Sequence, residues 1–399
     1  MRFTVPGSAV TLDTGRFSQS PLRGNKRVRL ITLVLLLLVV VTWRPSPPFP
    51  PVYPEAASEG AMRFEGRVVR FEQTRGSYSE QLSRILLYQQ LAFASGRSYA
   101  YDPIHVDSTL FRWPWRSASL PLSAFLMLDG AVPSSSLRCS STHTVVADTL
   151  QQVQNELSRD GEACIRIQGE ILNDDFFYSS APIDMVDTIK APLYVPSPRV
   201  LAIVNSALPQ IAPESGMAVA GGKAVQLRHL LVLELPGGKA WGAICHEAYE
   251  DSKPFFGFNT LPKHPGNENM PPPLTMASPV RKGVYEAKCQ PKMTDIIARA
   301  RRMRKNHPLL KSAYIVTDAP ENWVNEVRKW LLSEGWERIW IGRRDVWAGA
   351  AEREVGQGVE MEIARRAGVY VGNGFSPFSS NLVLVRRKDG VHPDLTQYW

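Results

Sequence analysis

The segment that most constrains the fold lies near the C-terminus, at residues 359–381. Its pattern predicts, in order, a helix, a short apolar strand, a glycine-rich turn and the start of another helix. This order places unpaired backbone N–H groups at the carboxyl edge of a sheet, beside a helix N-terminus. Such groups hold anions, and the diphosphate of a sugar nucleotide would suit them. An ordinary strand–turn–helix connection is the alternative interpretation, because Gly-Asn-Gly turns are common.

The charge of the chain is concentrated at its N-terminus. The 399 residues carry a formal net charge of +8, and residues 1–44 hold seven basic side chains and one acidic side chain. The other 355 residues hold 39 basic and 37 acidic side chains. This nearly neutral body argues against a nucleic-acid-binding protein, which needs a basic face on its folded domain. The length is sufficient for two domains and a large core.

Residues 30–43 form an apolar run that is broken only by Thr32 and Thr42. A helix of this length spans about 21 Å, which is short of a typical hydrocarbon core of about 30 Å. Basic residues cluster at 23–29, before the run, and only Arg44 stands just after it. The positive-inside rule then keeps the N-terminus in the cytosol and the body in the lumen. We therefore expect a single-pass type II protein of the Golgi or endoplasmic reticulum membrane.

Three segments are thus expected before the body: a cytoplasmic basic tail at 1–29, a signal-anchor transmembrane helix at 30–43 in contact with the lipid bilayer, and a stem at 44–62. Six of the ten residues 45–54 are proline, which favours an extended, semi-rigid stem. A cleaved signal peptide is the alternative to the anchor, although no small-residue cleavage site directly follows the apolar run.

The four cysteines all fall on the predicted lumenal side of the membrane. An even count in an oxidising compartment predicts two disulfides, for which three pairings are possible. We expect the pairs Cys139–Cys164 and Cys245–Cys289. Buried free thiols are the alternative, because free cysteine is often buried.

The body alternates predicted strands and helices. A strand at 67–71, a helix at 82–94 and a strand at 98–101 match the opening unit of a doubly wound sheet. We predict an α/β fold with two Rossmann-like domains, at 63–224 and 225–399, that face each other across a cleft. In the second domain the pattern predicts strands at 226–235, 313–317, 338–341 and 369–372 and helices at 294–305, 321–334 and 350–366.

Four separated parts of the body share an order with a known family. They are 76–81 with 97–102, 111–116 with 120–124, Cys245 with 255–262, and 359–381 ahead of Tyr398 and Trp399. In this order they resemble the O-fucosyltransferase-like proteins of fungi, which are relatives of the GDP-fucose protein O-fucosyltransferases. The resemblance covers roughly residues 65–399. It implies a GT-B-type glycosyltransferase fold with GDP-fucose as the donor in the cleft and no required metal or cofactor.

The resemblance also implies which residues bind the donor. In relatives, an acidic residue thirteen positions before the Gly-Asn asparagine contacts the guanine side, and here Glu360 stands there, where aspartate is usual. The turn that binds the diphosphate falls on Ser376, Pro377 and Phe378, and Pro377 removes one N–H donor. Arg386 stands where a basic residue could face the phosphates, with an ordinary surface position as the alternative. The implied donor-binding residues are Gly76, Ser77, Tyr78, Gln81, Glu360, Asn373, Gly374, Ser376, Phe378 and Arg386.

One family motif is altered in this chain. In the family, the strand that opens the second domain ends in His-X-Arg-(Arg)-Gly-Asp, and its arginine neutralises the departing diphosphate in a cleft without a metal. Here Glu234 stands at the histidine, Pro236 at the arginine and Lys239 near the aspartate. Lys239 is a candidate substitute, as a point charge without the bidentate fork of arginine. Glu234 is the other candidate catalytic residue.

Three hypotheses follow for function. The first is a type II membrane glycosyltransferase, O-fucosyltransferase-like, that moves fucose from GDP-fucose to an unknown protein or glycan acceptor. The second is a catalytically degenerate relative that binds a nucleotide sugar or a glycan without turnover. The third is a membrane-tethered structural or partner-binding protein that keeps only the fold, since fold does not fix function.

Two other features bear on the site. Trp113 and Trp115 flank a proline and could stack on a sugar or an acceptor peptide, with a packed aromatic loop as the alternative. The histidines lack metal-ligand spacing, and Asp174 and Asp175 are adjacent rather than in an Asp-X-Asp arrangement. We therefore expect no metal site.

Overall fold

The computed structural model describes residues 53–399, except 63, 65, 74–75, 106–118, 140–141, 160–162, 187–188, 190–193, 214–226, 262–277 and 347–353. The chain divides into two compact units, Met1–Phe49 and Pro50–Trp399, and everything described here belongs to the second. The predicted tail, transmembrane helix and first part of the stem lie outside the described residues. The last part of the stem, predicted to be extended, is instead the helix Pro54–Ala61, whose Glu59 is buried against the body. Within the described ranges, no helix is long and apolar enough to cross a bilayer.

The first sheet has five strands in the order β6-β2-β1-β8-β7, and all its pairs are parallel. Its central strand β1 (Val68–Phe71) is flanked by β2 (Ser98–Tyr101) and β8 (Cys164–Gln168). The outer strands are β6 (Val132–Pro133) and β7 (His143–Val146). Short antiparallel pairs join β3 (Ile104–His105) to β4 (Ser119–Leu120) and β5 (Leu126–Met127) to β9 (Val195–Pro196).

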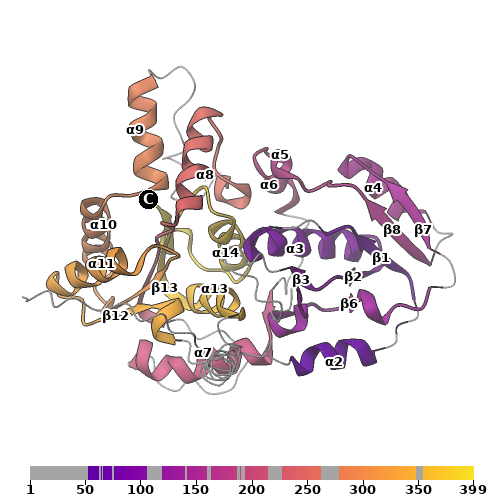
Figure 1. The fold of residues 1–399 in the computed structure, drawn as a ribbon, viewed down its shortest axis with the longest axis horizontal. Coiled ribbons are helices and arrows are strands. Elements are labelled where there is room, and N and C mark those ends of the chain that lie inside the picture. The colour runs from indigo at the N-terminus through magenta and orange to yellow at the C-terminus, as the bar shows by residue number, and fades with distance from the viewer. Residues whose placement is uncertain are drawn as a thin grey trace, which may run out of the picture. The chain divides into compact units, whose positions relative to one another are not determined.

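Helix α3 (Tyr78–Ala94) covers this first sheet (Figure 1). It begins four residues before the predicted start, because Ser77 and Glu80 form a capping box at its N-terminus. The ring of Tyr88 stacks on Phe71 of β1 with centroids 4.2 Å apart. The other helices of this part are α2 (Pro54–Ala61), α4 (Leu150–Leu157), α5 (Asp174–Phe177), α6 (Ala181–Met185) and α7 (Pro198–Ile211).

The second sheet also has five strands, in the order β12-β11-β10-β13-β14, and is entirely parallel. Its central strand β10 (Leu227–Glu234) lies between β11 (Ser312–Val316) and β13 (Ala367–Gly372), with β12 (Arg338–Ile341) and β14 (Thr396–Tyr398) at the edges. The chain adds β11 and β12 on one side of β10 and then returns to add β13 and β14 on the other. The order of the strands therefore switches between β10 and β13.

Helices cover both faces of the second sheet, as Figure 1 shows. Helices α10 (Met293–Asn306) and α11 (Glu321–Ser333) pack on one face through a cluster that includes Ile296, Val327 and Leu233. Helices α13 (Gly356–Arg366) and α14 (Pro377–Lys388) cover the other face. Helices α8 (Lys239–Glu250) and α9 (Ser278–Cys289), which the sequence patterns did not predict, follow β10.

Polar contacts join the two halves of the body at α3 and α14. Ser83 Oγ donates to Asn381 Oδ1 at 2.8 Å, and Asn381 Nδ2 donates to the Ser79 carbonyl at 2.7 Å. One buried apolar cluster also contains residues from both sheets. The predicted α/β class, with a parallel sheet in each half, is confirmed. The predicted domain boundary at 224–225 falls in a segment outside the described residues.

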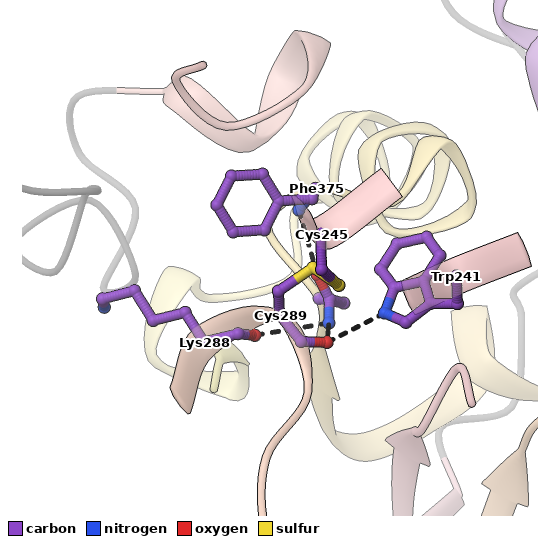
Figure 2. The surroundings of a disulfide bond; sticks show 6 residues. Trp241, Cys245, Lys288, Cys289 and Phe375 are labelled. Atoms are coloured by element: carbon purple, nitrogen blue, oxygen red, sulfur yellow. Dashed lines mark hydrogen bonds between the residues drawn. A yellow bond between two sulfur atoms is a disulfide. The ribbon is translucent and has the colours of Figure 1, made fainter. Parts of the chain in front are cut away.

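Disulfides join Cys139 to Cys164 and Cys245 to Cys289, which are the pairs predicted from the sequence. The first ties β8 to the segment after β6. The second ties α8 to the last residue of α9, and there the Trp241 indole donates to the Cys289 carbonyl at 2.9 Å (Figure 2). This second bridge fixes the backbone beside the carboxyl ends of β10 and β13, because Cys289 also accepts from Asn373 Nδ2 at 2.8 Å.

Candidate functional site

The candidate site lies at the carboxyl ends of β10 and β13. Ligands of doubly wound sheets bind outside the strand ends at the point where the strand order switches. Glu234 is the last residue of β10, and Asn373 directly follows β13. The parallel register, in which Leu233 pairs with Val371, brings these two ends together although they are far apart in the sequence.

Glu234 is a buried carboxylate in the middle of this site, with a side chain that is 4% exposed. Its Oε2 accepts from the Tyr370 hydroxyl at 2.5 Å and from the Asn373 N–H at 3.3 Å. Its Oε1 accepts from Ser376 Oγ at 2.5 Å, and the Ser379 hydroxyl also donates to Oε2. The chain thus brings its own carboxyl group to the place where the sequence predicted a bound anion.

The N-terminus of α14 explains why the serines turn toward Glu234. Ser376 is the N-cap, and its Oγ accepts from the N–H groups of Phe378 and Ser379 at 3.1 and 3.5 Å. Pro377, at the first position of the helix, has no N–H to satisfy. Because Ser376 Oγ accepts from the helix, its own proton is free to be donated to Glu234.

Burial controls the protonation of this cluster. Burial raises the pKa of the Glu234 carboxyl, and the hydrogen bonds from Ser376, Ser379, Tyr370 and Asn373 oppose the rise without cancelling it. Burial also holds the pKa of the Tyr370 phenol well above its usual value, and the Glu234 charge adds to that effect. Tyr370 therefore stays a hydrogen-bond donor at neutral pH.

The Gly-Asn-Gly turn between β13 and α14 is buried and internally bonded. Asn259 Nδ2 donates to the carbonyls of Gly374 and Ser376 at 2.9 and 3.1 Å. A Cβ atom at Gly374 would lie 2.5 Å from the Phe255 ring, so the ring requires glycine there. Asn373 and Ser376 are buried as well. These residues shape the edge of the site, and their polar groups are used within the protein.

The N-terminus of α8 is occupied in a similar way. The N–H groups of Gly237 and Gly238 donate to Asp318 Oδ1 at 2.8 and 3.3 Å, and Asp318 follows β11. Pro236, which the sequence resemblance sets at the position of an arginine, brings no cationic group. Lys239 is the first residue of α8, and its side chain lies outside the described part of the structure.

The predicted residues at the N-terminus of α3 form a third place where a carboxylate of the chain accepts from a backbone N–H group. The Ser77 N–H donates to Glu80 Oε2 at 2.7 Å, and a Cβ at Gly76 would lie 2.4 Å from the same oxygen. Gln81 is buried and donates to the carbonyls of Gly76 and His105 at 2.7 and 2.5 Å. Tyr78 is also buried, and its ring stacks on Phe125 with centroids 4.6 Å apart. Gly76 and Ser77 are the residues of this group that keep some exposure.

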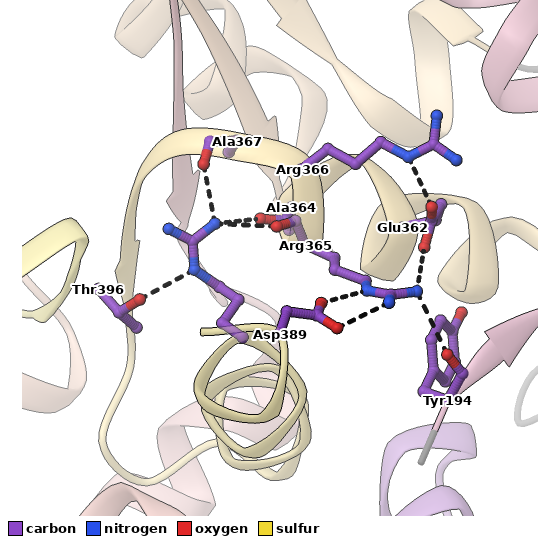
Figure 3. Close-up of polar contacts among 9 residues, drawn as sticks. Tyr194, Glu362, Ala364, Arg365, Arg366, Ala367, Asp389 and Thr396 are labelled. Carbon is purple, nitrogen blue, oxygen red and sulfur yellow. Dashed lines mark hydrogen bonds and ion pairs between the residues drawn. The ribbon is translucent and has the colours of Figure 1, made fainter. Parts of the chain in front are cut away.

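Arg386 was predicted to face a diphosphate or lie on the surface, and the structure corrects both expectations. Its side chain is 1% exposed. The guanidinium donates to the carbonyls of Ala364 at 3.0 Å and Ala367 at 2.9 Å and to Thr396 Oγ1 at 2.9 Å. Figure 3 shows Ala364 and Ala367 at the end of α13 and Thr396 on a separate segment, with the ion pair of Arg365 and Asp389 nearby. Arg386 caps the carbonyls at the C-terminus of α13, where a cation is favoured by the helix dipole.

Glu360 lies on α13 beside the carboxyl end of β12. Its side chain is 6% exposed. A Cβ at Gly342 would lie 2.5 Å from Glu360 Oε1 and 2.4 Å from the Tyr314 hydroxyl, so both groups converge on this glycine. Burial raises the pKa of the Tyr314 phenol well above its usual value, and the nearby Glu360 adds to the rise. Phe378 is buried in α14, whereas Trp113 and Trp115 lie outside the described residues.

Sequence reasoning missed three members of the site: Tyr370, Ser379 and Asp318. Of these three, only Ser379 carried a signal in the sequence: it stands three residues after the N-cap Ser376 and therefore lies on the same side of the first helical turn. Among the described residues, no group of three or more His, Cys, Asp or Glu side chains is arranged to hold a metal ion.

Among known proteins, similarity to this chain is found only in solved structures. No family model and no curated protein matches it. POFUT1 in complex with GDP-fucose is 12% identical, with a TM-score of 0.49 over 85% of this chain and 99% of that chain. POFUT1 in complex with GDP is 13% identical, with a TM-score of 0.48 over 84% and 98%. A mutant of Arabidopsis thaliana FUT1 in complex with GDP is 12% identical, with a TM-score of 0.36 over 92% and 79%. All three TM-scores are below 0.5, so none of these likenesses assigns an activity to this chain.

Proposed function

We propose that this protein is an O-fucosyltransferase-like glycosyltransferase that takes GDP-fucose as its donor and a protein or glycan as its acceptor. The observation that carries the proposal is the position of its most family-like segment. Residues 359–381 form most of α13, all of β13, the turn and the start of α14. That turn lies at the switch point between β10 and β13, where folds of this kind bind nucleotides.

In this proposal Glu360 recognises the guanine side of the donor. The Watson–Crick edge of guanine presents N–H donors, and a carboxylate at a buried position accepts them strongly. Asn373, Gly374 and Ser376 shape the edge of the site, because they are buried and hydrogen-bonded within the protein. Gly76 and Ser77 keep some exposure, and we propose them for contact with the diphosphate.

A second candidate function is favoured by one observation in particular. Glu234 carries a carboxylate at the N-terminus of α14, and Pro236 replaces the arginine that would neutralise a leaving diphosphate. A diphosphate placed beside an ionised Glu234 would be repelled, whereas a family transferase needs positive charge there. This observation favours a relative that binds a nucleotide sugar or a glycan without turnover.

The test is calorimetric titration of GDP into the full-length protein in detergent, with UDP as the nucleotide control and EDTA present throughout. We expect GDP to bind and UDP to bind much more weakly. Glu360→Gln should weaken GDP by about tenfold through the loss of charge-assisted hydrogen bonds, and leave UDP unchanged. Glu337→Gln, at an exposed carboxylate, is the matched control. No GDP binding at millimolar concentration would refute both nucleotide-binding functions. GDP-fucose turnover then separates the transferase from the inert relative.

We also propose that residues 30–43 anchor the protein in the Golgi or endoplasmic reticulum membrane with the body in the lumen. The proposal rests on the apolar run and on the basic residues before it. Resistance of the membrane-bound protein to carbonate extraction, together with protection of the body from added protease, is the expected result. Release of the protein by carbonate would contradict an anchor.

A further inference from the structure

A pocket of about 480 Å³ lies between α9 and α10, and Trp399 forms part of its lining. The Trp399 N–H donates to the Gly372 carbonyl at 3.3 Å, and its indole donates to the Glu234 carbonyl at 2.8 Å. These bonds place the pocket at the carboxyl edge of the second sheet. Figure 1 shows the C-terminus there, beside α9 and α10. None of the residues proposed for the GDP-fucose site lines this pocket.

The lining of the pocket carries more positive than negative charge. Lys288, Arg299 and Arg302 line it together with one acid, Asp295. Asp295 is committed elsewhere, because its carboxylate accepts from the Lys292 N–H at 3.3 Å and caps α10. Within the described part of the chain, no carboxylate forms an ion pair with any of the three cations. The four ionisable side chains of the lining therefore have a net charge of +2 when all are ionised.

These cations are close enough to repel one another. Burial and the charge of Arg299 lower the pKa of the Lys288 ammonium to about 8. Burial and the charge of Arg302 also lower the pKa of the Arg299 guanidinium. Arg299 is held in place by a hydrogen bond to the Tyr398 carbonyl. The side chain of Lys288 extends away from the nearby disulfide (Figure 2). Its ammonium lies 5.8 Å from the centre of the Phe255 ring. A bound anion would relieve this repulsion.

The remaining lining is apolar. Val280, Val284, Pro291 and Trp399 offer a surface for a carbon skeleton, and the volume is within the range of small-molecule sites. A phosphate monoester carries about −1.5 to −2 charges at pH 7 and three acceptor oxygens. It balances three cations better than a carboxylate with a single charge does, and a planar guanidinium suits its oxygens.

We propose that this pocket binds a phosphate monoester whose apolar part rests against Trp399 and the valines of α9. Lys288, Arg299 and Arg302 contact the phosphate. This site is separate from the proposed GDP-fucose site, and the proposal does not depend on GDP-fucose binding there.

The test uses phenyl phosphate as the probe, titrated calorimetrically into the full-length protein in detergent, with benzoate as the singly charged comparison. We expect phenyl phosphate to bind, and benzoate to bind at least about tenfold more weakly. Arg302→Gln and Lys288→Gln should each weaken phenyl phosphate by about tenfold. Arg302 is exposed, so its replacement leaves the core intact. Asp295→Asn keeps a helix cap but removes the acid, and should tighten binding.

Matched controls come from the same two helices. Lys282→Gln on α9 and Lys305→Gln on α10 each remove an exposed cation that does not line the pocket, and both should change the affinity less than about twofold. Absence of phenyl phosphate binding at millimolar concentration would overturn the proposal. So would equal losses in the pocket variants and in the controls. Glu360→Gln should weaken GDP and leave phenyl phosphate unchanged, which separates failure of this site from failure of the GDP-fucose site.

Discussion

The pH dependence of stability at Glu234 is the sharpest consequence of the candidate site. Burial raises the pKa of this carboxyl in the folded protein. In the unfolded chain a glutamate titrates near about 4.3. The stabilising contribution of Glu234 is therefore complete below the unfolded pKa and is lost as the pH rises through the folded pKa. One group changes the free energy of unfolding by at most about 1.4 kcal/mol per pH unit in that window.

Two substitutions separate the charge of Glu234 from its hydrogen bonds. Glu234→Gln removes the titration, so its unfolding free energy should vary less with pH than that of the wild type. Glu234→Ala also removes the acceptor. Tyr370 and Asn373 can still donate to Ser379 Oγ, at 2.7 and 2.8 Å, but the protons of Ser376 and Ser379 lose their partner. Two buried, unpaired hydroxyls cost about 2–6 kcal/mol together.

The assay is urea unfolding, followed by tryptophan fluorescence, at a series of pH values between about 4.5 and 8, the range in which a raised glutamate pKa would act. The stability of the wild type minus that of Glu234→Gln should be largest at the acidic end and shrink as the pH rises. Glu337→Gln, at an exposed carboxylate, should reproduce the wild-type slope. A difference that grows with pH would refute the reasoning, because it would mean that the four hydrogen bonds outweigh burial and lower the pKa of Glu234.

Two further predictions concern the support of the site. Arg386→Met should destabilise the fold by about 3–5 kcal/mol, because it removes a buried guanidinium that binds the carbonyls at the end of α13. Thermal unfolding measures this loss. Weaker GDP binding with unchanged stability would instead indicate that Arg386 binds phosphate. The double variant Cys245→Ser with Cys289→Ser opens a loop of 44 residues and should cost about 4 kcal/mol on the chain-entropy model. A loss below about 1 kcal/mol in urea unfolding would show that packing around Asn373, rather than the bridge, holds this backbone.

The inner strands of the second sheet, β10, β11 and β13, could be read from the sequence because nearly all their residues are buried. Apolar runs of this kind are typical of parallel sheets. The edge strand β12 alternates between buried and partly exposed residues, and it coincides with the predicted strand at 338–341. Helix α8 escaped prediction because Gly238 gives it no side-chain cap and Gly242 interrupts its pattern. Helix α3 did carry a local signal for its true start, since Ser77 and Glu80 have the spacing of a capping box.

The site itself depends on contacts that sequence patterns do not encode. Glu234 and Ser376 are 142 positions apart, and only the register of β10 against β13 brings them together. Arg386 has charged neighbours in the sequence, so nothing local distinguishes a buried cap from a surface residue. The pairing of the cysteines was predicted, because four cysteines allow few arrangements.

Carboxyl groups and cationic side chains are distributed unequally over the possible anion sites of the body. The backbone N–H groups before α3, α8 and α14 are the natural anion sites of these sheets, and Glu80, Asp318 and Glu234 each bring a carboxylate to one of them. The cations between α9 and α10 have no such partner within the described residues. An incoming anion therefore meets an internal carboxyl group at the switch point and an excess of cationic side chains in the pocket that Trp399 lines. If GDP binding is lost in Arg302→Gln and kept in Glu360→Gln, the nucleotide binds in that pocket and not at the proposed GDP-fucose site.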